Sequence, residues 1–101
     1  MMKWEIECYT FHEVRELIDD GVESSETCVE IMEILADCCN EIAKGKESWD
    51  FYDDFIEMRD EINDELEYMC ETDDYDDLES KVNFMLNEMY DLCDAARVWL
   101  T

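Results

Sequence analysis

The chain contains no proline, only two glycines, and only seven lysine and arginine residues against 31 aspartates and glutamates. Proline and glycine mark most tight turns, so their scarcity disfavours an all-β domain and favours a few long helices. The shortage of basic residues leaves a formal net charge of −24. Nucleic acid and anionic membrane surfaces carry the same sign of charge, so we expect neither as a direct partner.

Motifs of catalysis and targeting are also missing. There is no glycine-rich phosphate loop and no Ser-His-Asp arrangement, and the single histidine is His12. A Cys-His nucleophile needs a cationic environment that lowers the pKa of the thiol, and this acidic chain supplies the opposite. No stretch reaches the roughly 18 apolar residues of a membrane span, and residues 1–10 do not resemble a secretory signal. We therefore expect a cytoplasmic protein that is not an enzyme.

Apolar residues are abundant and lie at helical spacing. They make up 48% of the chain, too many for a disordered acidic tail, and 101 residues are enough for a single domain over 1–101. Apolar positions recur every three or four residues in four segments, near 11–20, 25–44, 49–71 and 75–100. The pattern predicts a mainly α protein, an antiparallel bundle of about four helices.

Short signals mark the ends of these segments. Residues 3–9, KWEIECY, alternate between apolar and polar and predict a short N-terminal strand or extended segment. The helical remainder offers no second strand, so we expect this segment to pair across a dimer or to stay extended. Expected helix ends are a capping box at Thr10 and Glu13, serine caps at Ser24 or Ser25 and at Ser48, and glycines at Gly21 and Gly45.

The acidic residues concentrate in the third predicted helix and just after it. Residues 47–79 hold sixteen acids and one base, Arg59. The third helix carries about nine net charges over roughly 34 Å, or one per about 3.8 Å. One DNA strand carries a charge about every 3.4 Å. We interpret this surface as a nucleic-acid mimic for a basic groove. The expected partner-binding residues are Asp53, Asp54, Glu57, Asp60, Glu61, Asp64, Asp73, Asp74, Asp76 and Asp77.

The acidity also has simpler possible causes. Solubility needs a net charge of magnitude only about 2 to 8, so it does not account for the whole excess. A solvated helix face with no partner is the simplest alternative, and it stays open. Halophilic adaptation fits poorly, because the chain is rich in cysteine, methionine and aromatic residues.

The six cysteines include no CxxC pair, but Cys8 and His12 form a C-x₃-H spacing. Folding the chain back at the predicted turns brings Cys38 or Cys39 level with both Cys93 and the Cys8–His12 pair. This juxtaposition predicts one structural zinc ion in a Cys₃His site. The expected ligands are Cys8, His12, Cys39 and Cys93, with Cys38 as the alternate to Cys39. Reduced core thiols and disulfides are the alternatives.

Small size, a charge of −24, the acid run DFIEMRDEINDELEYMCETDDYDDLES and the lack of a catalytic constellation occur together here. In these respects the whole chain resembles the small acidic anti-CRISPR proteins of the type II group, which phages deploy against host defences. The resemblance implies an inhibitor, monomeric or dimeric, that binds a host RNA-guided nuclease and interferes with guide or target DNA loading. Such nucleases hold nucleic acid in positively charged channels.

Two further functions remain open on the residues alone. One is an oligomeric structural or adaptor protein that uses Trp4, Trp49, Tyr52 or Trp99 as aromatic anchors. The second is a zinc-binding regulatory domain built on the cysteines.

Overall fold

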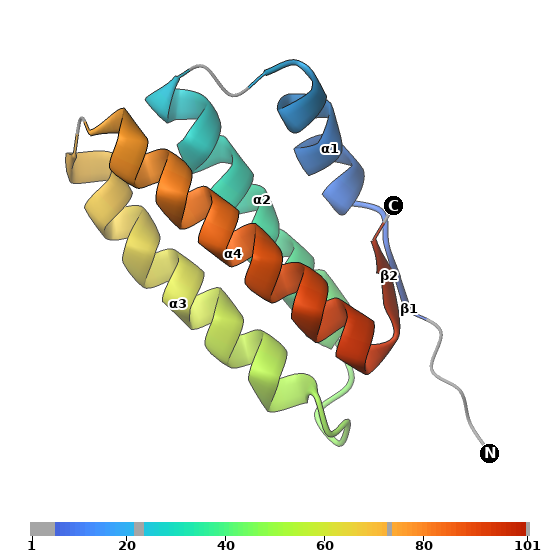
Figure 1. Ribbon diagram of the computed structural model, residues 1–101. Coiled ribbons are helices and arrows are strands. Elements are labelled where there is room, and N and C mark those ends of the chain that lie inside the picture. The colour runs from blue at the N-terminus through green and yellow to red at the C-terminus, as the bar shows by residue number, and fades with distance from the viewer. Residues whose placement is uncertain (1–5, 22–23, 73, 101) are drawn as a thin grey trace.

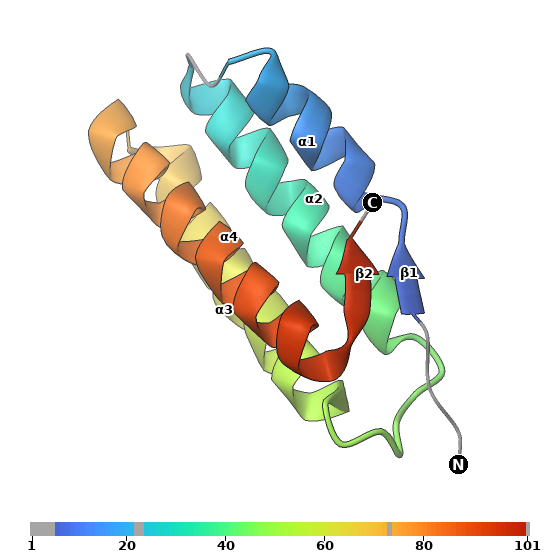
Figure 2. The same cartoon turned by 45° about the vertical axis from the view of Figure 1, so that its right-hand side comes forward.

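The computed structural model describes residues 6–21, 24–72 and 74–100. The elements in chain order are β1 (Ile6–Cys8), α1 (Phe11–Asp19), α2 (Ser25–Ala43), α3 (Tyr52–Glu71), α4 (Tyr75–Ala96) and β2 (Val98–Leu100). The predicted mainly α bundle of four helices is confirmed. Successive helices run antiparallel, and α1 lies on the side of α2 opposite to α3 (Figures 1 and 2).

Helix α2 is the centre of the bundle, because it contacts α1, α3 and α4. Its buried side chains accordingly spread over a wide face that includes Ile31, Leu35 and Ile42. The narrower apolar stripes of α3 and α4 face α2. The core side chains of α3 are Phe55, Met58, Ile62 and Met69, and those of α4 are Leu78, Val82, Met85, Leu86, Met89, Cys93 and Ala96. Helix α3 is therefore held along its length, with its opposite face in solvent.

The fourth helix ends at Ala96, so the prediction that it continues to Leu100 is wrong. Arg97 takes a left-handed conformation with φ 60° and ψ 44°, which stops the helix and reverses the chain. The residues that follow form β2. Trp99, one of the expected aromatic anchors, lies in β2 and is 59% exposed.

The N-terminal strand has a partner within the chain. Strand β1 pairs in parallel with β2, with Ile6 opposite Val98 and Cys8 opposite Leu100. The pairing is parallel because β2 runs back along the bundle after the Arg97 turn, in the direction of β1 and α1 (Figure 2). The prediction of pairing across a dimer or of an unpaired extended segment is therefore wrong. Residues 3–5 of the predicted strand lie outside the described residues.

The N-terminal caps follow the sequence only in part. Ser24 caps α2, since its hydroxyl accepts a hydrogen bond from the Thr27 N–H at 3.3 Å. Thr10 occupies the N-cap position of α1 but has a helical backbone and makes no side-chain cap bond, so the predicted capping box is wrong. Helix α3 begins after Phe51 rather than after Ser48.

Glycines follow the first two helices, and aromatic rings pack in the loop before α3. Gly21 and Gly45 follow α1 and α2 with φ of 97° and 72°, as predicted for residues that end helices. In the loop before α3, the Trp49 ring stacks on Phe55 at 5.5 Å between centroids. None of the helices in the described part of the chain is both long enough and apolar enough to cross a membrane.

Candidate functional site

The solvent face of α3 carries a row of carboxylates, which we call the acidic ridge. Its residues are Asp53, Glu57, Asp60, Asp64, Glu67 and Glu71. They recur every three or four residues, so they share one helix face, opposite the buried stripe. All six are exposed. From Asp53 to Glu71 the ridge spans roughly 27 Å at 1.5 Å per residue.

Two further predicted residues, Asp54 and Glu61, are exposed beside the acidic ridge. When these two acids are counted together with the acidic ridge, α3 presents about one negative charge per 4 Å of its length. The geometry therefore keeps most of the predicted partner-binding residues on one continuous surface.

The acids at the start of α4 have a structural role as well. The Asp74 carboxylate is the N-cap of α4 and accepts a hydrogen bond from the Asp77 N–H at 3.3 Å. Negative charge at this end also complements the helix dipole. Asp76 is exposed and Asp77 is half-buried, whereas Asp73 lies outside the described residues. Helix capping therefore accounts for part of the predicted acidic surface.

Two basic residues pair with acids of α3, one of them in the acidic ridge and the other beside it. Arg59 donates to Asp60 Oδ1 from Nε at 3.3 Å and from Nη2 at 3.1 Å, and its Nη1 donates to Asn40 Oδ1 on α2 at 2.9 Å. On the other side of α3, Lys81 Nζ lies 2.7 Å from Glu65 Oε2. Within the described residues, the ridge acids other than Asp60 form no ion pair. Most of the charge of the acidic ridge is thus available to a partner.

Hollows flank α3 on both sides. The hollow between α3 and α4 has a volume of about 550 Å³, and that between α2 and α3 about 710 Å³. Asp64 lines both. The first also contains Phe84, which is 59% exposed, and Lys81. These two residues were missed by sequence reasoning, although the position of Phe84 off the apolar stripe of α4 was a visible signal.

Lys81 shows how the surface beside the acidic ridge holds a cation. Its ammonium lies 5.0 Å from the centroid of the Tyr68 ring. The hydrogen bond with Glu65 raises the pKa of Lys81, against a smaller opposing effect of burial. A carboxylate next to an aromatic face binds ammonium or guanidinium groups. The chemistry beside the acidic ridge therefore suits a basic side chain.

Four buried thiols meet where β1, α2 and α4 converge: Cys8, Cys38, Cys39 and Cys93. The Cys8 thiol donates to Glu41 Oε2 at 3.1 Å, and the Cys39 thiol lies 4.0 Å from Met89 Sδ. A hydrogen bond with Cys8, followed by burial, raises the pKa of Cys38. Burial is the main cause that raises the pKa of Cys39 and of Cys93, each to about 12.

His12 does not join these thiols. Its Nε2 lies 3.0 Å from Glu16 Oε1, and its side chain is 65% exposed. Among the described residues, no group of three or more His, Cys, Asp or Glu side chains is placed to hold a metal ion. The predicted set of Cys8, His12, Cys39 and Cys93 is thus not assembled there, and zinc stays a prediction. Among the described residues, which include all six cysteines, no disulfide is formed, and Cys70 is the exposed one of the six.

Comparisons with protein-family models, with curated proteins and with solved structures find no match to this chain. The acidic ridge and its flanking hollows form the candidate functional site.

Proposed function

We propose that the protein is a non-enzymatic acidic inhibitor that binds a basic surface of a nucleic-acid-handling protein. We propose further that this target is a type II CRISPR effector nuclease. The observation that supports the proposal is the acidic ridge, a row of exposed carboxylates on one helix face, most of them without an ion pair among the described residues. An RNA-guided nuclease holds nucleic acid in a positively charged channel. An inhibitor seated there would interfere with guide or target DNA loading.

The rigidity of α3 favours binding. Phe55 and Ile62 are fully buried against the rest of the bundle, so the acidic ridge is held in place before a partner arrives. A preformed array of charge loses little conformational entropy on association. Its negative potential would also speed the encounter with a basic surface.

Mimicry of nucleic acid follows from the spacing of the charges. The acidic ridge with its two flanking acids presents about one charge per 4 Å. A DNA strand presents one per about 3.4 Å. In this proposal the carboxylates take the place of phosphates, and the inhibitor is phage-encoded and acts in the cytoplasm of the bacterial host.

Charge reversal on the acidic ridge tests the proposal. The variant Asp53→Lys, Glu57→Lys, Glu61→Lys, Asp64→Lys should bind its target about 100-fold more weakly or worse. The reason is that several charge-assisted contacts of about 1 kcal/mol each become repulsive. Inhibition of DNA cleavage, measured with a panel of purified type II effector nucleases, should be lost. Circular dichroism should show unchanged helicity.

A matched control changes the net charge equally at other sites. The variant Glu13→Lys, Asp19→Lys, Glu88→Lys, Asp91→Lys alters four exposed acids of α1 and α4. It should inhibit like the wild type. If the ridge variant still inhibits, or if the control loses inhibition to the same degree, the acidic ridge is not the interface.

An oligomeric adaptor is the second candidate, and exposed aromatic residues favour it. Trp99 and Phe84 are each 59% exposed. Of the remaining expected anchors, Trp49 is half-buried against Phe55, Tyr52 is half-buried, and Trp4 lies outside the described residues. A hydrophobic interface would be nearly insensitive to salt, so a salt titration of binding distinguishes the two candidates.

A further inference from the structure

The hollow between α3 and α4 borders the acidic ridge and combines acids with an exposed aromatic ring. The two helices lie side by side along most of their length (Figures 1 and 2). The volume of about 550 Å³ is within the range of pockets that hold small organic groups. Most of the wall consists of Glu61, Asp64 and Glu65 of α3 and Lys81, Phe84 and Met85 of α4.

Phe84 is the one phenylalanine whose side chain lies open to solvent. The chain has four phenylalanines, and the other three are buried or half-buried. Phe84 is 59% exposed, whereas Met85 next to it is only 4% exposed and belongs to the core. Unlike tyrosine or tryptophan, phenylalanine has no polar group that gains from contact with water. The Phe84 ring therefore offers an apolar aromatic face at the wall of the hollow.

The charge of the hollow is unbalanced. Three acids and one base, Lys81, line it, which gives a net charge of −2. Lys81 Nζ lies 2.7 Å from Glu65 Oε2, so these two side chains compensate each other. Within the described part of the chain, Glu61 and Asp64 form no ion pair. Two carboxylates without a counter-charge thus lie in the same hollow as the exposed ring.

A guanidinium group matches both features. It is planar, stacks on aromatic faces, and pairs with a carboxylate through two parallel hydrogen bonds. It is also less strongly hydrated than an ammonium group, so it loses less when it leaves water. The methylene groups of an arginine side chain can pack on apolar surface while the charged end stays near the acids.

We propose that this hollow receives an arginine side chain that projects from the basic surface of the partner. The guanidinium stacks on the Phe84 ring and pairs with Asp64 or Glu61, and the methylene groups pack toward Met85. Asp64 also belongs to the acidic ridge, so the arginine anchors one edge of the same interface. This anchor rests on the proposed function, in which the partner is a protein with a positively charged nucleic-acid channel.

Two peptides of equal charge, octa-arginine and octa-lysine, test the anchor by calorimetry near physiological salt. The variant Phe84→Leu removes the ring and keeps an apolar side chain. Its affinity for octa-arginine should fall about fivefold, because stacking of guanidinium on the ring is lost. Its affinity for octa-lysine should change by less than about twofold, because ammonium groups keep their hydration and bind the carboxylates as point charges.

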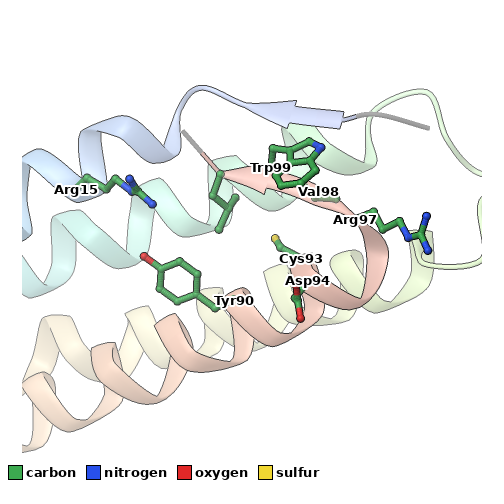
Figure 3. Close-up of a pocket in the computed structure, with 8 residues that line it drawn as sticks. Arg15, Tyr90, Cys93, Asp94, Arg97, Val98 and Trp99 are labelled. Atoms are coloured by element: carbon green, nitrogen blue, oxygen red, sulfur yellow. The ribbon is translucent and has the colours of Figure 1, made fainter. Parts of the chain in front are cut away.

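Tyr90→Leu is the matched control, because it also exchanges an aromatic ring of α4 for leucine. Tyr90 follows Phe84 by six residues, so it leaves the helix in a direction about 120° away. Its ring contacts Phe11 of α1 at 5.4 Å between centroids, and Figure 3 shows it pointing from α4 toward α1. This variant should bind both peptides like the wild type. Equal losses for the two peptides in Phe84→Leu, no loss for either, or the same selective loss in Tyr90→Leu overturns the proposal.

The nuclease assay distinguishes failure of the anchor from failure of the proposed function. If the wild type inhibits no nuclease of the panel while Phe84→Leu selectively loses octa-arginine, the proposed target is wrong and the arginine site stands. If the wild type inhibits a nuclease, half-inhibition by Phe84→Leu should require about fivefold more protein. A Phe84→Leu variant that inhibits as well as the wild type overturns the arginine anchor and leaves the acidic ridge as the interface.

Discussion

At the scale of single residues, burial determines the chemistry of the thiols between β1, α2 and α4. Cys39 and Cys93 have pKa values raised to about 12, chiefly by removal from water. At neutral pH both thiols keep their protons, so they are weak nucleophiles. A metal ion would have to displace those protons to bind. Cys70, by contrast, is exposed to solvent.

The raised pKa values predict a loss of stability at alkaline pH. When the pH is below 9.0, the ordinary pKa of a cysteine thiol, Cys93 is protonated in both the folded and the unfolded chain. Above it, only the unfolded chain releases the proton. The free energy of unfolding should therefore fall by up to about 1.4 kcal/mol per pH unit and thiol, until the pH reaches about 12. Urea unfolding between about pH 8 and about pH 10.5 measures the decrease.

Comparison with variants isolates this effect from other groups that titrate in the same range. Cys93→Ala should show a shallower decrease with pH than the wild type. Cys70→Ala, which removes an exposed thiol, should follow the wild type. Identical pH dependence in all three proteins would contradict the assigned cause.

The sequence predicted the positions of the cysteine thiols better than the position of His12. Short turns between antiparallel helices fix which residues share a level, so the proximity of Cys39 and Cys93 could be estimated by counting. Which face of α1 meets α2 depends on packing across the bundle. Phe11 and Val14 are the buried residues of α1, and His12 lies on its exposed side.

At the scale of elements, the end of α4 was the least predictable feature. Ala96 and Trp99 continue the apolar spacing of the helix, and no glycine or proline marks its end. The decisive interaction is the pairing of β2 with β1, at the other end of the chain. A local pattern cannot contain that information. The long helices were predictable, because each carries its own apolar stripe.

Ser24 caps its helix with a side-chain hydrogen bond and Thr10 does not, so the two residues should differ in their contribution to stability. Ser24→Ala removes the hydrogen bond to the Thr27 N–H and should lower the free energy of unfolding by about 1 kcal/mol. Thr10→Ala is the matched control, because the Thr10 side chain makes no cap bond. It should change the free energy of unfolding by less than about 0.5 kcal/mol. Urea unfolding of both variants checks the difference, and equal losses would contradict the assignment of the caps.

At the scale of the whole molecule, the charge of −24 has opposite consequences for folding and for binding. Acids three or four residues apart on the ridge repel one another by a few tenths of a kcal/mol per pair. The folded state brings these charges closer together than the unfolded chain does, so it carries the larger repulsion. The sequence alone made the excess charge evident, but not the ion pair of Lys81 with Glu65, which depends on the contact between α4 and α3.

Salt should therefore stabilise the protein and weaken its complex at the same time. The Debye length falls from about 10 Å at 0.1 M salt to about 3 Å at 1 M, which screens repulsion within the chain and attraction to a basic partner alike. Between these concentrations of sodium chloride the melting temperature should rise, and affinity for the target should fall by an order of magnitude or more. The variant with lysines at Asp53, Glu57, Glu61 and Asp64 should show a smaller rise in melting temperature. Affinity that stays constant over this range, with the protein folded throughout, would exclude an electrostatic interface and favour the aromatic adaptor.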